Sequence, residues 1–241
     1  MKFRSHRGGV YYTPENTMPA FEMAIKQGYS HIETDPCLTK DGVVVLFHDK
    51  TLNRTCRNFD GSVIEDPVKL EDLTYEELMQ YDAGIALGEQ FKGTRIPKLS
   101  ELLELAQGTD VIIALDKKIS TADVDKLIDV VVQYDAKVCF SCADTERIKA
   151  VQRRLPDAMI DYDGNTLEAD LEKISSMVKR ENLIVWMYLD KPNFSWLTDR
   201  VKVSPENCAR VKRYARLGIA NVNNPCDVME AFGYEPEFIE V

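Results

Sequence analysis

Short apolar runs recur along most of this chain, and segments with helical spacing of apolar residues separate most of them. Eight strand-like runs are predicted at 3–6, 28–32, 111–115, 137–141, 158–161, 183–189, 217–222 and 237–241. A helix with apolar residues Met18, Phe21, Ala24 and Ile25 is predicted before Gly28, and further helices are predicted at 99–107, 121–134, 144–154, 166–180, 205–216 and 225–232. Such alternation favours a parallel sheet, and eight units in 241 residues favour a closed (β/α)8 TIM barrel. An open doubly wound sheet is the alternative.

Residues 49–98 interrupt the alternation. A hairpin signal at 39–42 leads into an extra apolar strand at 43–47, and the following segment holds one short predicted helix at 74–80 among glycines and prolines. We expect 49–98 to be an excursion inserted after the second strand, with little core of its own, that caps a face of the barrel. The whole chain, 1–241, is then expected to be a single domain.

Composition and charge exclude several classes of protein. The chain is 44% hydrophobic and 29% charged, as in ordinary globular proteins, and its net charge of −10 argues against nucleic-acid or anionic-membrane partners. It contains no apolar run long enough to span a bilayer. The N-terminus lacks a signal-peptide core, so we expect a cytoplasmic protein, or a secreted one whose signal is absent from this sequence. The oligomeric state is left open.

Six cysteines are scattered through the chain, which is not the pattern of a disulfide scaffold. Cys139 and Cys142 have C-x-x-C spacing but lie on a predicted strand, where residues three apart face opposite ways. We expect buried free thiols rather than a metal or redox pair.

Ionisable residues collect where the predicted strands end, which is the active-site rim of a TIM barrel. His6 and Arg7 follow the first strand, and Glu33 and Asp35 end the second. Asp116 and Lys118 follow the third, and His48 ends the extra strand, beside Asp49. Two of the three histidines therefore lie at this rim, and the third, His31, is expected to be a packing or surface residue.

Glu33 and Asp35 are two residues apart on a strand, so their side chains project from the same face. Two neighbouring carboxylates repel each other unless a cation lies between them, and all-oxygen sites suit Mg²⁺, Ca²⁺ or Mn²⁺. A solvated pair of acids is the alternative, but the accumulation of histidines and cations at the same rim favours a site.

Several motifs, in this order and spacing, resemble those of the glycerophosphodiester phosphodiesterase family, whose fold is a phospholipase-C-like barrel. They are His6-Arg7-Gly8, Pro14-Glu15-Asn16-Thr17, Ala20-Phe21, Glu33-Thr34-Asp35, Thr39-Lys40-Asp41-Gly42, His48-Asp49, Asn53-Arg54-Thr55 and Ile96-Pro97-Lys98-Leu99. The resemblance is strong from residue 6 to about 105. It implies metal-dependent hydrolysis of glycerophosphodiesters to glycerol phosphate and an alcohol.

The resemblance also implies roles for individual residues. His6 and His48 would be the acid–base pair, and Arg7 and Lys118 would bind the phosphate. Glu33, Asp35 and Asp116 would bind a divalent metal, Mg²⁺ or Ca²⁺. Glu15 would contact the metal or substrate, or would cap and orient its loop.

The chain departs from the family pattern at three places. Asp116 stands where the family has glutamate, Ala220 stands where it has tryptophan, and its closing Gly-x-x-x-x-Thr-Asp segment is not recognisable at 233–241. These departures leave two alternatives open. One is a related phosphodiesterase of the lysophospholipid or sphingomyelin type, and the other is a degenerate barrel that binds phosphodiesters or metal without turnover. Both histidines are retained, which argues against the degenerate barrel.

Overall fold

The computed structural model describes residues 1–191 and 198–241. Its parallel strands follow the order β1-β12-β11-β10-β9-β8-β7-β2 of a closed barrel, which confirms the predicted (β/α)8 fold. These strands are β1 (Lys2–Ser5), β2 (His31–Thr34), β7 (Ile112–Leu115), β8 (Lys137–Cys142), β9 (Met159–Tyr162), β10 (Leu183–Tyr188), β11 (Arg216–Ala220) and β12 (Phe238–Glu240). Each lies within two or three residues of a strand predicted from the sequence.

The helices also form close to where apolar spacing predicts them. They are α1 (Met18–Lys26), α3 (Leu99–Ala106), α4 (Val124–Val131), α5 (Thr145–Gln152), α6 (Glu168–Met177), α7 (Pro205–Tyr214) and α8 (Pro225–Phe232). Capping defines several of their starts. The hydroxyl of Ser204 accepts from the N–H of Asn207, and proline follows at the first helical position of α7, where a missing N–H costs nothing. No described helix is long and apolar enough to cross a membrane.

The chain divides into two compact units. One comprises residues 1–4 and 138–241, and the other comprises residues 5–137. The sequence prediction of a single domain with a capping excursion stays a prediction.

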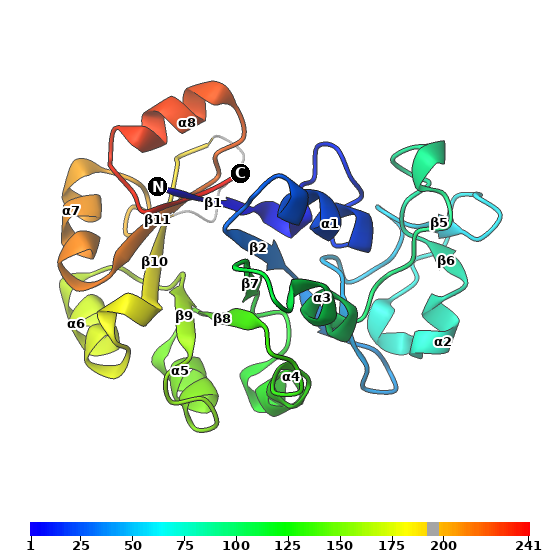
Figure 1. The fold of residues 1–241 in the computed structure, drawn as a ribbon, viewed down its shortest axis with the longest axis horizontal. Helices are drawn as coiled ribbons and strands as arrows, with labels where there is room; N and C mark the ends of the chain where they lie inside the picture. Colours follow the sequence, from blue (N-terminus) through cyan, green and yellow to red (C-terminus); the bar gives the residue numbers. More distant parts are fainter. Residues whose placement is uncertain (192–197) are drawn as a thin grey trace. The chain divides into compact units, whose positions relative to one another are not determined.

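In the unit of residues 1–4 and 138–241, strands β8 to β12 pair in parallel with their sequence neighbours, and β12 pairs with β1. Helices α5, α6 and α7 cover the outer side of these strands (Figure 1). Gly218 on β11 is paired in register with Trp186 on β10. A Cβ at this glycine would lie 2.6 Å from Cε3 of Trp186, so only glycine leaves room for the indole ring.

A buried charge cluster lies on these same strands. One guanidinium nitrogen of Arg4 is 2.6 Å from Oδ2 of Asp161, and the other is 2.6 Å from Oε2 of Glu240. The guanidinium also lies 3.4 Å from the ring centroid of Trp186. The Cys139 thiol donates to Asp161, and its pKa is raised because burial and the neighbouring carboxylate oppose ionisation. We call Arg4, Asp161, Glu240 and Trp186 the strand cluster.

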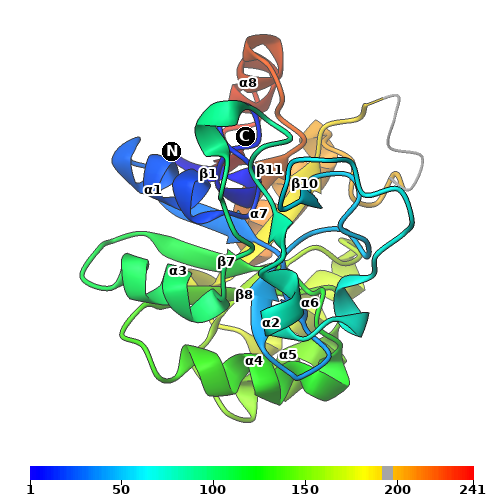
Figure 2. The same cartoon turned by 90° about the vertical axis from the view of Figure 1, so that its right-hand side faces the viewer.

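In the unit of residues 5–137, β2 pairs in parallel with β7, with Thr34 opposite Leu115. Helices α3 and α4 lie side by side (Figure 2). The apolar face of α3 is fully buried through Leu99, Leu102 and Leu103, as its spacing requires.

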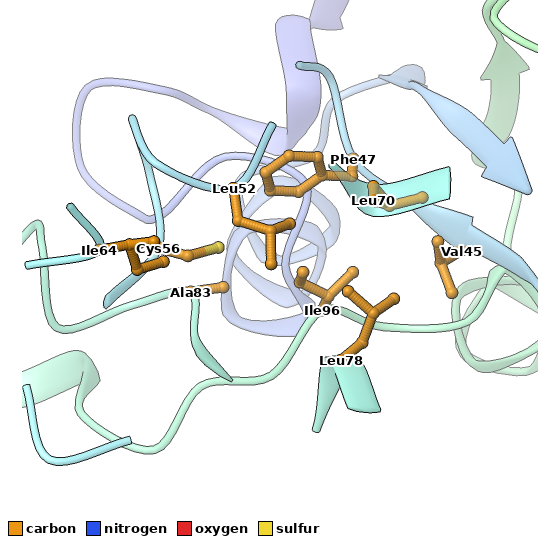
Figure 3. Close-up of a cluster of buried hydrophobic side chains, with 9 residues drawn as sticks. All are labelled: Val45, Phe47, Leu52, Cys56, Ile64, Leu70, Leu78, Ala83 and Ile96. Carbon is orange, nitrogen blue, oxygen red and sulfur yellow. The ribbon is translucent and has the colours of Figure 1, made fainter. Parts of the chain in front are cut away.

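The excursion is more ordered than its composition predicts. After the hairpin of β3 (Pro36–Leu38) and β4 (Val44–Leu46), it contains β5 (Arg57–Asn58), α2 (Tyr75–Leu78) and β6 (Tyr81–Asp82). The expectation of little core is wrong. Seven of its buried apolar side chains pack with Val45 of β4 and with Phe47, which follows that strand (Figure 3): Leu52, Cys56, Ile64, Leu70, Leu78, Ala83 and Ile96. These side chains are spread over about fifty residues without periodicity, so the sequence did not reveal them.

All six cysteines are free, including Cys139 and Cys142, for which buried free thiols were predicted. Cys139 and Cys142 on β8 are both fully buried, and burial raises the pKa of the Cys142 thiol to about 12. Their C-x-x-C spacing therefore reflects two buried thiols on one strand.

Candidate active site

The residues predicted to form the site belong to the unit of residues 5–137. His6, half-buried, begins a short 3-10 turn directly after β1, and Arg7 follows it. Glu33 lies in β2 and Asp35 directly follows that strand, while Asp116 directly follows β7. His48 and Asp49 follow β4. The carboxyl ends of the strands thus supply most of these side chains, as a barrel site requires.

The turn after β1 has an unusual backbone that brings it against β2. Arg7 has φ 50°, and Gly8 has φ 83°. A Cβ at Gly8 would lie 2.8 Å from Cβ of Ala20, so glycine lets the turn approach α1 closely. The backbone N–H of Arg7 donates to Oε2 of Glu33 at 2.9 Å. A left-handed arginine costs about 1–3 kcal/mol, and such strain concentrates at functional sites.

The guanidinium of Arg7 lies between two acids. Its Nη1 donates to Oε1 of Glu15 at 2.9 Å, and its Nε is 3.4 Å from Oδ2 of Asp35. Lys118 adds a second cation, with its Nζ 3.5 Å from Oδ1 of Asp35. Arginine and lysine thus meet at one carboxylate, where an anionic phosphate would find two positive partners.

Asn16 takes part in this arrangement, although sequence analysis placed it in a motif without assigning it a role. Its Nδ2 donates to Oδ2 of Asp35 at 2.8 Å, and its Oδ1 accepts from Oγ1 of Thr34 at 2.7 Å and from the N–H of Asp35 at 3.3 Å. Asn16 is buried and, with φ 55°, left-handed, a conformation that asparagine tolerates better than most residues. It fixes the orientation of the Asp35 carboxylate.

His48 is paired with the next residue in the chain. Its Nδ1 is 2.7 Å from Oδ1 of Asp49, and 31% of the imidazole side chain is exposed. Although burial raises the pKa of Asp49, hydrogen bonds from Arg54 and His48 outweigh it and hold this pKa at about 2. Asp49 is therefore a carboxylate at neutral pH, and it can accept a hydrogen bond from a protonated Nδ1 of His48, leaving Nε2 for a substrate.

Arg54 connects Asp49, the partner of His48, with Glu15, the partner of Arg7. Sequence analysis assigned it no role. Its Nε and Nη2 donate to the two oxygens of Asp49, at 2.5 and 3.1 Å. Its Nη1 and Nη2 donate to the two oxygens of Glu15, at 2.9 and 2.6 Å. These carboxylates raise the pKa of Arg54 above its ordinary value. The signal available in the sequence was the Asn53-Arg54-Thr55 motif.

Glu15 is held by two arginines, Arg7 and Arg54. Burial raises its pKa, but the hydrogen bonds and charges of the two arginines outweigh burial and lower it. This pairing favours a role in orienting loops, whereas direct contact of Glu15 with metal or substrate stays a prediction. Glu15 and Arg54 also line a cavity of about 240 Å³, together with Val10, Thr13, Pro14, Thr55, Ala83, Ala86 and Leu87.

The three predicted metal ligands, Glu33, Asp35 and Asp116, do not form a complete metal site in the described part of the chain. Within residues 1–191 and 198–241, no three histidine, cysteine or carboxylate side chains are close enough together to hold a metal ion. The carboxylate of Asp116 is 3.8 Å from Nζ of Lys117. The donor set nevertheless fits a hard cation. Glu33, Asp35 and Asp116 offer only oxygen, and Asp116 follows Leu115, the register partner of Thr34, so its backbone lies beside Asp35.

Comparisons with known proteins found one family model and several curated relatives that match this chain. Residues 6–162 match the family model described as "Glycerophosphoryl diester phosphodiesterase family". A glycerophosphodiester phosphodiesterase of Caldanaerobacter subterraneus is 36% identical over 162 residues, which are 65% of this chain and 63% of that protein. The chain spans still smaller shares of other curated relatives, such as 38% of one from Bacillus subtilis.

Solved structures share the fold over the full chain. A glycerophosphoryl diester phosphodiesterase of Parabacteroides distasonis is 25% identical with a TM-score of 0.76, and the match covers 99% of this chain and 81% of that one. A phosphodiesterase of Oleispira antarctica, solved in complex with the product sn-glycerol-3-phosphate, is 20% identical with a TM-score of 0.80, covering 100% and 92%.

Proposed function

This chain belongs to the glycerophosphoryl diester phosphodiesterase family, and we propose that it hydrolyses glycerophosphodiesters to glycerol phosphate and an alcohol. One observation carries the proposal. Two strand-end histidines, each directly followed by a charged residue, lie in the unit that also holds the paired acids Glu33 and Asp35. The product complex of the Oleispira relative supports the same substrate class.

Hydrolysis of a phosphodiester needs one proton removed from the attacking group and one delivered to the leaving alkoxide. His6 and His48 are the groups that we assign to these transfers. Asp49 accepts from Nδ1 of His48, so Nε2 of that ring is the atom that holds or delivers the proton. Either water or the substrate's own hydroxyl can be the attacking group under this assignment.

Arg7 and Lys118 bind the phosphate in the proposed mechanism. Both cations already lie within 3.5 Å of Asp35, so they can turn to a phosphate oxygen without a change of fold. The overall charge of −10 repels a phosphodiester, and this local pair of cations provides the attraction that the rest of the chain does not.

Glu33, Asp35 and Asp116 would hold the divalent cation, Mg²⁺ or Ca²⁺. Such a cation, when bound, stabilises the charge that develops on the phosphate oxygens. Asn16 and the N–H of Arg7 hold the carboxylates of Asp35 and Glu33 in place.

A panel of diesters tests the function. Purified protein is incubated with glycerophosphocholine, lysophosphatidylcholine or sphingomyelin, after chelation and after addition of Mg²⁺ or Ca²⁺. We expect glycerol phosphate from the first substrate, only with metal. Preference for the second or third substrate would favour the lysophospholipid or sphingomyelin alternative. Binding without any turnover would favour the degenerate barrel.

The replacement Asp116→Glu tests the third ligand. Aspartate is shorter than the family's glutamate by about 1.5 Å, the length of one carbon–carbon bond. Mg²⁺ requires oxygens at about 2.0–2.1 Å, whereas Ca²⁺ accepts about 2.3–2.6 Å, so we expect the wild type to prefer Ca²⁺ or to use a bridging water. The variant should gain Mg²⁺ affinity. No gain would mean that another group, Glu15 first, completes the site.

A further inference from the structure

A continuous chain of charged contacts runs from His48 to Asp35. Asp49 contacts the imidazole, Arg54 contacts Asp49, Glu15 contacts Arg54, and Arg7 contacts both Glu15 and Asp35. Its members come from three separate segments: the loop after β1, the end of β2, and the stretch that runs from His48 after β4 into the start of the excursion. We call these residues the site network.

Arg54 makes more of these contacts than any other described member of the site network. Each of its three guanidinium nitrogens donates to a carboxylate, two oxygens of Asp49 on one edge and two of Glu15 on the other. This geometry uses the planar fork of arginine, and a lysine ammonium cannot reproduce it.

Stability alone does not account for this arrangement. The Arg54 side chain is 49% exposed, and an exposed ion pair contributes little because solvent and salt screen it. The effect of Arg54 on the orientation of Asp49 is more specific than its effect on stability. Asp49 and His48 are adjacent in sequence, and an aspartate next to a histidine is free to turn toward solvent unless a further group holds it.

We propose that Arg54 is a positioning residue that holds the Asp49 carboxylate against Nδ1 of His48, with Glu15 as its anchor. Arg54 thereby fixes the tautomer and the orientation of the imidazole ring. The assignment rests on the proposed function, in which His48 transfers a proton through Nε2. It gives the excursion a part in catalysis, because Arg54 belongs to it.

The test compares Arg54→Gln and Arg54→Lys with a matched control, Arg57→Gln. Arg57 lies three residues away in the same excursion, and the partner seen for its guanidinium is the carbonyl of Cys56 rather than a carboxylate. Loss of the groups that orient metal-binding histidines and carboxylates typically costs about 10–100-fold in metal affinity or activity, and we expect an effect of similar size for a group that orients a proton-transferring histidine. We expect such a loss in kcat for both Arg54 variants, little change in KM, and wild-type values for Arg57→Gln.

Two further readouts separate positioning from folding. Nitrogen-15 spectra of the histidine rings report the tautomer without any turnover, so they remain informative even if the proposed substrate is wrong. We expect His48 to carry its proton on Nδ1 in the wild type and a mixture of tautomers in Arg54→Gln. Guanidinium ion at millimolar concentration should restore part of the kcat of Arg54→Ala, since the position is half-exposed.

An unchanged His48 tautomer and kcat in Arg54→Gln would overturn the proposal. So would a kcat loss that follows the loss of folded protein in thermal melts, because Arg54 would then be merely structural. Failure of the wild type to cleave any diester, with the tautomer shift present, would reject the proposed function and leave the positioning of His48 intact.

Discussion

The site network in residues 5–137 and the strand cluster around Arg4 are built from the same kinds of contact but differ in setting. The strand cluster lies on strands, with the side chains of Arg4 and Asp161 only 8% and 1% exposed. The site network lies mostly on loops, with Arg54 and His48 49% and 31% exposed. Only the site network contains a histidine.

The difference in exposure predicts different roles for the two groups of charged residues. A dry cluster on strands has no route for substrate and strongly penalises the loss of one partner, so its effect is on stability. The exposed part of the site network, Arg54 with Asp49 and His48, contributes little to stability but presents an acid, a cation and an imidazole to solvent. Replacements in the two clusters should therefore have opposite effects on activity and stability.

The largest effect is expected for the histidines. His6→Ala and His48→Ala should each lower kcat by about 10²–10⁴-fold, because each removes a positioned acid or base. Thermal melts should stay close to the wild type. Steady-state kinetics on the best diester measures the loss, and near wild-type rates in both variants would reject the acid–base assignment.

Replacements in the strand cluster should lower stability and leave kcat unchanged. Arg4→Met leaves Asp161 and Glu240 without their shared cation, and breaking a buried pair costs about 3–5 kcal/mol. Urea unfolding should show that loss, while kcat per folded molecule stays unchanged. The double variant Arg4→Met with Asp161→Leu should recover part of the stability. A fall in kcat without a fall in stability would give the strand cluster a role in the reaction.

Two glycine replacements, one in each unit, should have smaller effects on stability and should differ in their effect on kcat. Gly8→Ala and Gly218→Ala each place a Cβ too close to a neighbour, at 2.8 Å from Ala20 and 2.6 Å from Trp186. Overpacking of this kind costs about 1–3 kcal/mol in either place. Only Gly8→Ala should also lower kcat, because it displaces the turn that carries His6 and Arg7. Equal kcat values in the two variants would contradict this.

The smallest effect concerns pH. The pKa of Asp49 is about 2 in the folded protein against an ordinary 3.8. Because the pKa is lowered, its contribution to stability is present above about pH 4 and is lost as the pH falls toward 2. Urea midpoints between pH 5 and 2 should therefore fall less steeply in Asp49→Asn than in the wild type. Parallel curves would show that Asp49 is not held as described.

The sequence predicted the barrel because strand and helix periods are local properties, and each of the eight strands has its own apolar run. That Glu33 and Asp35 share a face, because a strand alternates with a period of two, stays a prediction, since Asp35 lies just beyond the end of β2. The sequence could not predict the pairings of Arg54 or Asn16, which depend on loops meeting in space. The excursion core was missed for the same reason, because its residues approach one another without any period.

Calorimetric titration of Mg²⁺ and Ca²⁺ tests most directly the claim that the acids of residues 5–137 form the functional centre. The proteins compared are the wild type, Glu33→Gln and Asp161→Asn. We expect Glu33→Gln to lose binding of both ions by orders of magnitude and Asp161→Asn to bind them as the wild type does. Wild-type binding by Glu33→Gln, or loss of binding in Asp161→Asn, would contradict the account.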